Sequence, residues 1–345
     1  MHCELIVPAL LAQGEDAVAA LKDLRLPALE LLLARARHTS DGTVSLEAWL
    51  AETFDGDGEA EIPAGALTLA ASGGQAGEAV WMRADPAHLK LNHAALVLVP
   101  AVAFGVPAAE AQALTETLNR HFSGELVFHP LSGERWCVRI ENIPCAGLRT
   151  KAPVEVAGRD INRHLPSGEG AMRWHGLLNE IQMLLHEHPV NEAREARGEP
   201  AVNSVWLWGA GTMPREVTAP YQSVTTDDPL ALGFAQAAGL RHRTLPPTAG
   251  EWLNRLPEDG RQLVVLDALR MPLALGDFEG WRMRITELEE RWFAPLVAAL
   301  KSGRIGMVTM LVPDGTELRA FESVRHDLRK FWRRVKPVAS YLLDV

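Results

Sequence analysis

Apolar and polar positions follow two different rhythms along this chain, most clearly in its second half. Short, almost fully apolar runs at residues 204–207, 262–266 and 305–311 are typical of buried strands. Between them lie longer stretches with apolar residues three and four positions apart, which predict amphipathic helices. Because buried strands separated by helices usually run parallel, we predict an α/β fold with a mainly parallel, layered sheet. The predicted helices cover residues 170–185, 229–238, 249–256, 278–300 and 323–335.

The first half begins in the same way and then changes. A strand at residues 4–11 precedes helical patterns, and residues 55–63 are rich in turn residues. From residue 79 onward, short strands surround one long helix at residues 107–122. We therefore predict an α/β core formed by residues 1–78 and 161–345, interrupted by an inserted α+β subdomain at residues 79–160. The first helices are expected at residues 14–24, 27–37 and 45–53, and the subdomain strands at 80–84, 95–99, 125–128 and 135–140.

Composition narrows the class of protein. The formal net charge is −10, which argues against nucleic-acid binding, because proteins that bind phosphate backbones broadly need a basic face. The three cysteines are odd in number and have no metal-site spacing, which fits a reducing compartment. The N-terminus carries Glu4 and no basic segment, so no signal peptide is expected, and the longest apolar run, residues 94–109, is too interrupted to cross a bilayer. These features predict a cytoplasmic protein without a membrane span.

A basic run near the C-terminus departs from this acidic balance. We predict that it lies on the solvated face of a helix, where cations near the C-terminal end suit the helix dipole. Contact with an anion, a membrane surface or a protein partner is the alternative. The run consists of Arg325, Arg329, Lys330, Arg333, Arg334 and Lys336.

Two of the predicted strands end next to residues that could bind a ligand or take part in a reaction. The strand at residues 204–207 is followed by Gly209-Ala210-Gly211, where backbone N–H groups have room to approach an anion, although a plain structural turn is the simpler explanation. The strand at residues 262–266 ends in Asp267, a residue type that holds metal ions, orients bases or caps helices. Asp227 and Asp228 directly precede a predicted helix, where N-capping is the better interpretation.

The segment from His188 to Gly211 also resembles part of a known family. His188-Pro189-Val190-Asn191 is followed by Arg194, by Gly198, by Val202-Asn203 and then by Gly209-Ala210-Gly211. This order is similar to the archaeal-type, cofactor-independent phosphoglycerate mutases of the alkaline phosphatase superfamily, and in particular to their bacterial RpfE-like relatives. The resemblance is specific over residues 178–211 and faint elsewhere. It implies an alkaline-phosphatase-like core and a ligand-binding role for His188, Asn191, Arg194, Asn203, Trp208, Gly209 and Gly211.

The chain departs from these mutases at the residues that their reaction needs. Two divalent metal ions, held by Asp and His residues, and a serine nucleophile are implied by the resemblance. Here Pro8-Ala9-Leu10 follows the first strand where Asp-Gly is expected, and only Gly276-Asp277 remains of a later Asp-to-Gly-His stretch. Trp208 stands at the position of a substrate-facing arginine, and an indole cannot form the paired contacts of a guanidinium. We therefore predict a mutase-like protein with a degenerate metal site and no cofactor, which acts in regulation or binds a phosphorylated small molecule or a protein.

Two other functions remain open at this stage. One is an active 2,3-bisphosphoglycerate-independent phosphoglycerate mutase, or another phosphoryl-transfer enzyme, with a rearranged Mn²⁺ or Zn²⁺ site; its candidate catalytic residues are Asp267 and Asp277, with His188 beside them. The other is an interaction protein with a tryptophan-rich binding surface, although the ten tryptophans of the chain serve a core equally well.

Overall fold

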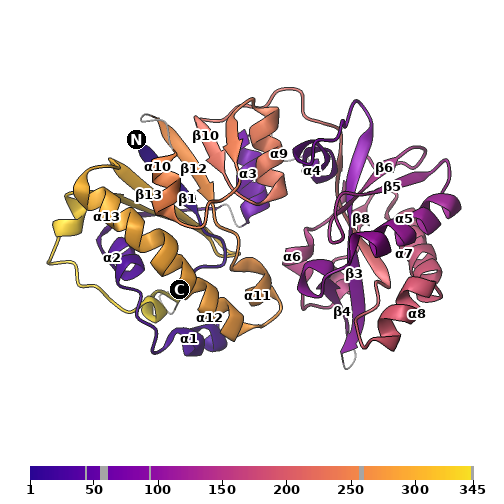
Figure 1. Cartoon of the computed structure of the whole chain (residues 1–345), viewed down its shortest axis with the longest axis horizontal. Coiled ribbons are helices and arrows are strands. Elements are labelled where there is room, and N and C mark those ends of the chain that lie inside the picture. The colour runs from indigo at the N-terminus through magenta and orange to yellow at the C-terminus, as the bar shows by residue number, and fades with distance from the viewer. Residues whose placement is uncertain (43–44, 55–60, 93–94, 256–259, 343–345) are drawn as a thin grey trace. The chain divides into compact units, whose positions relative to one another are not determined.

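Two sets of internal contacts divide the chain. The computed structural model describes residues 1–42, 45–54, 61–92, 95–255 and 260–342. Residues 1–58 and 217–345 form the first unit, and residues 59–216 form the second (Figure 1). The predicted division at residues 79 and 160 differs from this one. The second unit is longer at both ends because α4 (Ala64–Ala71) and β9 (Ser204–Gly211) both pack against β3 (Val80–Asn92).

The first unit is built on a seven-stranded sheet with the order β11-β10-β12-β1-β13-β14-β2. The strands from β11 to β13 run parallel to one another, while β14 and β2 are antiparallel additions at one edge. This sheet confirms the prediction of a mixed α/β fold with a largely parallel sheet. The strands are β1 (His2–Ile6), β2 (Arg37–Asp41), β10 (Ser223–Thr225), β11 (Arg241–Arg243), β12 (Arg261–Val265), β13 (Met307–Pro313) and β14 (Leu318–Val324).

Helices pack on this sheet through leucine-rich and tryptophan-containing faces. The predicted helix at residues 278–300 is present as two helices joined by a π-helical turn at Glu289–Phe293. The carboxylate of Glu289 accepts hydrogen bonds from the backbone N–H groups of Ala28 and Leu29, at 2.7 and 2.9 Å, and so caps the start of α2. The helices are α1 (Glu15–Leu21), α2 (Pro27–Arg35), α3 (Leu46–Phe54), α9 (Pro229–Ala237), α10 (Ala249–Asn254), α11 (Arg270–Ala274), α12 (Phe278–Leu288) and α13 (Ala294–Ser302).

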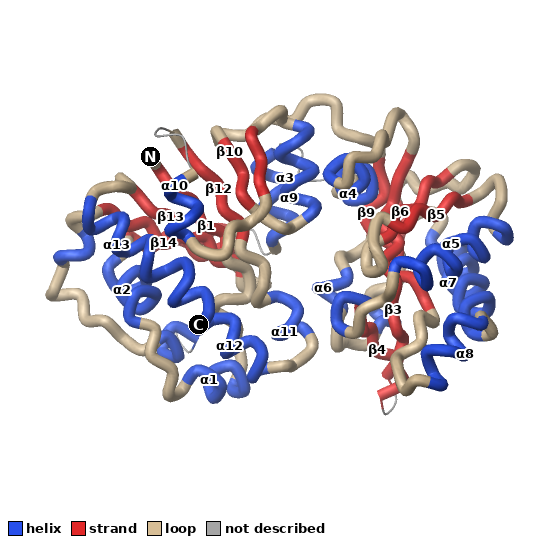
Figure 2. Tube along the Cα trace, viewed as in Figure 1, coloured by secondary structure: helices blue, strands red, loops and turns tan. Residues whose placement is uncertain are grey.

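The second unit contains an antiparallel sheet in which β3 pairs with β4, β6 and β9, and β6 pairs with β5. Figure 2 shows α5, α7 and α8 together on one side of this sheet. On α4, Gly65 is required because a Cβ atom there would lie 2.4 Å from the backbone nitrogen of Met82. The remaining elements are β4 (Ala95–Pro100), α5 (Ala108–His121), β5 (Leu126–Pro130), β6 (Trp136–Ile140), β7 (Leu148–Arg149), α6 (Pro153–Val156), β8 (Ser167–Gly168), α7 (Ala171–His186) and α8 (Pro189–Ala196).

Three predictions need correction. The strand at residues 204–207 does not belong to the parallel sheet: it is part of β9, which runs antiparallel to β3 in the second unit. The helix predicted at residues 323–335 is wrong, because β14 extends to Val324 and a short 3-10 turn at Asp327–Arg329 follows it. The helix predicted at residues 27–37 ends at Arg35, and Arg37 already belongs to β2, a strand that was not predicted. The predicted turn at residues 55–60 lies outside the described residues.

The tryptophans belong to the interior. Nine of the ten are at most 7% exposed, and Trp332 is 66% exposed. The prediction of a tryptophan-rich binding surface is therefore wrong. Within the described ranges, no helix has the length and apolar character needed to cross a membrane.

Candidate functional site

The segment that carries the family resemblance forms part of the framework of the second unit. His188 caps α8: its ring Nδ1 accepts a hydrogen bond from the N–H of Val190 at 3.2 Å, and its Nε2 lies 3.1 Å from the hydroxyl of Thr117. Asn191 is 1% exposed and binds backbone groups on both sides of the turn. Its amide nitrogen donates to the carbonyls of Leu185 and Val202, and its oxygen accepts from the N–H of Val202. These contacts tie α7, α8 and the approach to β9 together.

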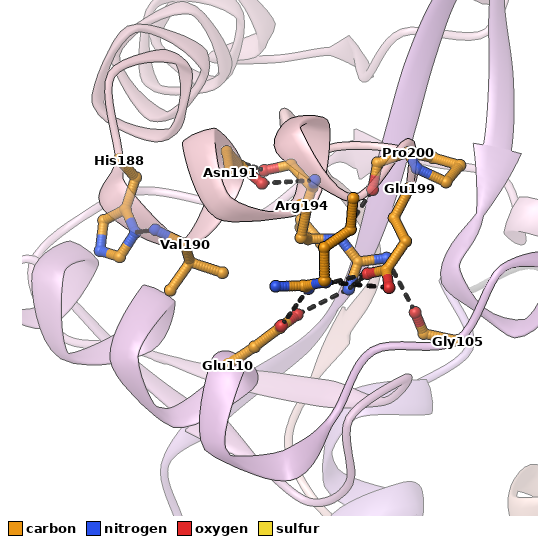
Figure 3. A network of polar contacts seen from close by, with 10 residues as sticks. Gly105, Glu110, His188, Val190, Asn191, Arg194, Glu199 and Pro200 are labelled. Atoms are coloured by element: carbon orange, nitrogen blue, oxygen red, sulfur yellow. Dashed lines mark hydrogen bonds and ion pairs between the residues drawn. The ribbon is translucent and has the colours of Figure 1, made fainter.

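Arg194 lies at the centre of a buried network (Figure 3). Its guanidinium donates to the carbonyl of Pro200 at 2.7 Å and to that of Gly105 at 3.0 Å, and forms an ion pair with Glu110 at 2.6 Å. Only 1% of the residue is exposed. Through these contacts the arginine braces the loop before β9 against α5.

The next positions along the segment are also occupied internally. Asn203 pairs through its amide with the backbone N–H and carbonyl of Leu89, at 2.7 and 3.0 Å. The N–H of Gly209 donates to the hydroxyl of Thr150 at 2.9 Å, and Gly209 has a φ of 66°. Cβ atoms at Gly209 and Gly211 would approach Ala64 and Pro63 within 2.4 and 2.8 Å. The glycines thus permit close packing of α4 on β9.

Trp208 completes a buried ion pair. Arg83 and Asp85 on β3 are each 5% exposed and contact one another directly. The indole N–H of Trp208 donates to the second carboxylate oxygen of Asp85 at 2.7 Å, and the Arg83 guanidinium lies 5.4 Å from the centre of the indole ring. The tryptophan therefore satisfies a buried charge and supplies a cation–π contact.

A cluster of charged side chains gathers beyond the carboxyl ends of β10 and β12 in the first unit. One nitrogen of Arg270 contacts both carboxylate oxygens of Glu47, at 2.6 and 2.8 Å. Loss of hydration on burial, and then the negative charge of Asp267, raise the pKa of Asp228 to about 6. Burial also raises the pKa of Asp267, against the opposing charge of Arg270. We call Glu47, Asp228, Asp267 and Arg270 the acid–arginine cluster.

The acid–arginine cluster does not fit the two-metal site that the resemblance implies. Arg270 occupies both oxygens of Glu47, and Asp228 caps α9 by accepting from the N–H of Ala231 at 2.8 Å. The cluster contains no histidine, and its guanidinium repels a divalent cation. Over the ranges that the structure describes, no three His, Cys, Asp or Glu side chains are arranged to hold a metal ion.

The candidate catalytic residues belong to different units. Asp267 belongs to the acid–arginine cluster of the first unit, whereas His188 lies in the framework of the second. Asp277 is exposed and caps α12 through the N–H of Gly280 at 2.9 Å.

The second unit also contains a cavity of about 1120 Å³, which we call the basic pocket. Among the described residues, the side chains of Arg149, Lys151 and Arg163 form no hydrogen bond or ion pair, so their charges are available to a ligand. Thr150 and Ser167 add hydroxyl groups to the lining. The wall also includes Gly211 and Thr212 at the end of β9.

Two further groups set the chemistry of the basic pocket. The Nδ1 atom of His164 is buried and has no partner among the described residues, and burial lowers the pKa of its ring. Glu61 contributes one carboxylate, which contacts the hydroxyl of Thr150. Burial raises the pKa of Glu61, which favours its neutral form. With Arg149, Lys151 and Arg163 against the single carboxylate of Glu61, the lining carries a net positive charge.

The basic pocket was missed at the sequence level. Arg149 lies on β7, Lys151 follows it, and Arg163 ends a short 3-10 helix at Ile161–Arg163, so no periodic pattern connects these cations. The close spacing of Arg149 with Lys151, and of Arg163 with His164, was the available signal. By contrast, the predicted ligand-binding role of the His188–Gly211 segment stays a prediction, and the contacts of its side chains are internal.

The two units define a mixed α/β protein with a largely parallel central sheet and a second, antiparallel unit. The sequence model of the 2,3-bisphosphoglycerate-independent phosphoglycerate mutases matches residues 71–191. The match lies within the second unit, and it extends the similarity across residues predicted to resemble the family only faintly. The chain is thus phosphoglycerate mutase-like over about a third of its length.

Individual relatives also match only part of the chain. A probable mutase of this name from Geobacter sulfurreducens is 34% identical over 151 residues, which is 43% of this chain and 38% of that protein. The corresponding mutase from Methanothrix thermoacetophila is 27% identical over 186 residues, covering 49% of this chain and 47% of that protein. The chain therefore matches less than half the length of these relatives. The solved structure of the PH0037 protein from Pyrococcus horikoshii, at 13% identity, has a similar fold: the TM-score is 0.55 over 98% of this chain and 91% of that one.

Proposed function

We propose that this phosphoglycerate mutase-like protein binds a phosphorylated small molecule in the basic pocket and does not carry out metal-dependent phosphoryl transfer. The observation that carries the proposal is the set of three unpaired cations in that pocket. The finer assignments, to an alkaline-phosphatase-like core and to the bacterial RpfE-like group, belong to the same proposal.

The chemistry of the basic pocket suits a phosphate ester. Guanidinium groups match the geometry of phosphate oxygens, and hydrogen bonds between charged groups are about twice as strong as neutral ones. The hydroxyl of Ser167 is a further donor to phosphate oxygen atoms. A volume of about 1120 Å³ exceeds what phosphate alone needs and leaves room for the organic part of a metabolite.

The acid–arginine cluster supports the second half of the proposal. A phosphoryl-transfer site with two metals places both ions against the attacking and leaving oxygens. Here the guanidinium of Arg270 pairs with Glu47 and attracts Asp228 and Asp267 at the carboxyl edge of the sheet, and Pro8-Ala9 follows β1. An arginine so placed holds the acidic residues together without activating a nucleophile.

Calorimetric titration of the whole chain with 3-phosphoglycerate, and separately with glycerate and inorganic phosphate, tests the binding function. We expect the phosphate ester to bind more tightly than glycerate, and R163M to weaken binding about tenfold or more, as expected for one lost charged hydrogen bond. R139M removes a partly exposed arginine that lies outside the pocket and pairs with Glu141, and it serves as the control. Equal affinity of R163M and the unmodified protein would overturn the proposed pocket.

A mutase assay with added Mn²⁺ or Zn²⁺, together with metal analysis of the purified protein, tests the absence of catalysis. We expect no turnover of 3-phosphoglycerate. Turnover accompanied by two bound metal ions would establish the active-enzyme alternative, whatever the titration shows. The two experiments therefore fail independently of each other.

A further inference from the structure

Residues 329–336 of the first unit combine exposed aromatic rings with positive charge. Phe331 is 81% exposed, Trp332 is 66% exposed and Val335 is 44% exposed. These three apolar side chains stand among Arg329, Lys330, Arg333, Arg334 and Lys336. Since every other tryptophan of the chain is at most 7% exposed, Trp332 stands apart from all the rest.

The exposure is built into the fold. The segment lies between two anchors, because Leu328 and Val338 are 6% and 0% exposed. Its backbone turns through hydrogen bonds from the N–H of Phe331 to the carbonyl of Arg329 at 2.8 Å and from the N–H of Arg333 to the carbonyl of Lys330 at 3.0 Å. The rings of Phe331 and Trp332 lie edge to face, with centroids 5.3 Å apart. The fold thus presents both rings to the outside as a pair.

Neighbouring contacts hold the turn in place and leave part of its charge available. Arg333 donates to the carbonyl of Ala36, at the end of α2, and Lys330 pairs with the carboxylate of Asp327. Among the described residues, the side chains of Arg329 and Arg334 form no hydrogen bond or ion pair. Arg37, on the exposed edge strand β2, extends the positive charge on this side of the unit.

We infer that residues 329–336 bind the surface of an anionic lipid bilayer. Aromatic rings favour the boundary between lipid headgroups and acyl chains, and each basic residue near an anionic surface strengthens binding by about fivefold. Residues 329–336 are positively charged although the chain as a whole has a net charge of −10. An anionic surface therefore attracts this side of the first unit. Two neighbouring aromatic rings surrounded by cations suit shallow insertion into a lipid surface. A peptide partner would need a pocket for its side chains, and the two described pockets are lined by other residues.

Vesicle cosedimentation with the full chain tests this inference. We expect binding to vesicles of phosphatidylcholine with 30% phosphatidylserine, little binding to phosphatidylcholine alone, and weakening in 0.5 M salt. R329Q/R334Q is expected to weaken binding about 25-fold, and F331S/W332S about tenfold or more. R25Q/R215Q and M172S/M183S remove equally exposed groups elsewhere and are expected to bind as the unmodified chain does.

Fluorescence provides a second readout, because Trp332 is the exposed indole. Brominated lipid chains are expected to quench part of the tryptophan emission, and W332F is expected to lose that quenching while its circular dichroism stays unchanged. Equal binding to neutral and anionic vesicles, or full binding by R329Q/R334Q, would overturn the inference. Binding to polyglutamate without binding to anionic vesicles would overturn it in favour of an acidic protein partner.

Discussion

Replacing Asp228 with asparagine removes one negative charge from the acid–arginine cluster while keeping its helix cap. In the protein, Oδ1 of Asp228 accepts from the N–H of Ala231 at 2.8 Å, and the amide oxygen of asparagine can accept the same bond. The substitution therefore separates the charge of residue 228 from its structural role. Asp267 and Glu47 remain to balance Arg270.

The magnitude follows from the pKa of Asp228. Its rise from 3.8 to about 6 means that the folded protein binds this proton more tightly than the unfolded chain does. Each pKa unit corresponds to about 1.4 kcal/mol, so ionising the pair that Asp228 forms with Asp267 costs the folded state about 3 kcal/mol. The free energy of unfolding of the unmodified protein therefore falls as the pH rises from about 4 to about 6. D228N lacks this loss, and we expect it to be roughly 1–3 kcal/mol more stable at pH 8.

Hydrogen exchange at pH 5 and pH 8, corrected for intrinsic rates and read from peptides covering β10 and β12, measures the effect in the first unit alone. D277N is the matched control, because Asp277 also caps a helix but is exposed. We expect the stabilisation by D228N to shrink at the lower pH and D277N to change protection little at either. Lower protection in D228N at pH 8, or a difference independent of pH, would refute the reasoning.

Four other substitutions probe the remaining contacts. R270M leaves Glu47 buried without its cation, so the free energy of unfolding of the first unit is expected to fall by about 3–5 kcal/mol in urea titrations, and an unchanged midpoint would contradict the role given to Arg270. W208F removes the donor to Asp85 and is expected to lower protection of β3 and β9 by about 1–3 kcal/mol in hydrogen exchange, with W206F as the comparison. N191A removes three buried hydrogen bonds and is expected to cost about 3 kcal/mol or more in thermal or urea unfolding of the second unit; a loss below 1 kcal/mol would show that the turn holds without them. G65A places a Cβ atom against the backbone of Met82, so we expect the packing of α4 to loosen, seen as faster exchange in residues 64–71, whereas unchanged exchange would mean that α4 shifts freely.

The sequence predicts elements well where burial imposes a period. The helices α5, α7 and α9 and the strands β12 and β13 were expected close to where they lie, because one face or both faces of each are apolar. β2 was missed because all five of its residues are exposed, so its strand conformation comes from pairing with β14 and not from its own pattern. The same limit applies to β14, whose alternating burial appears only once the strand is paired.

Sheet membership is harder to predict than strand position. Residues 204–207 form an apolar run as continuous as that of β12, and only the pairing partner differs. The run was therefore assigned to the parallel sheet, and a ligand site was expected at its end. The polar residues around it were predicted to bind a ligand. Their side chains are connected by hydrogen bonds, but connection alone does not separate a bracing network from a binding site.

The candidate site depends on distances that are not local in the chain. Glu47 and Arg270 are 223 positions apart, and Thr150 and Glu61 are 89 apart. A single sequence gives no signal for such pairs, since neither partner belongs to a motif. Short-range signals such as an N-cap were predicted correctly at Asp228, because they depend on a few neighbouring residues.

The indole of Trp208 limits which residues position 208 can accept. An arginine at this position would bring a second guanidinium beside Arg83, and Asp85 would be the one carboxylate shared by two buried cations. Placing an arginine at residue 208 therefore requires a compensating change on β3. The Arg83–Asp85–Trp208 arrangement thus couples the residue type at position 208 to the charges on β3, so the two cannot be changed one at a time without leaving a buried charge unbalanced.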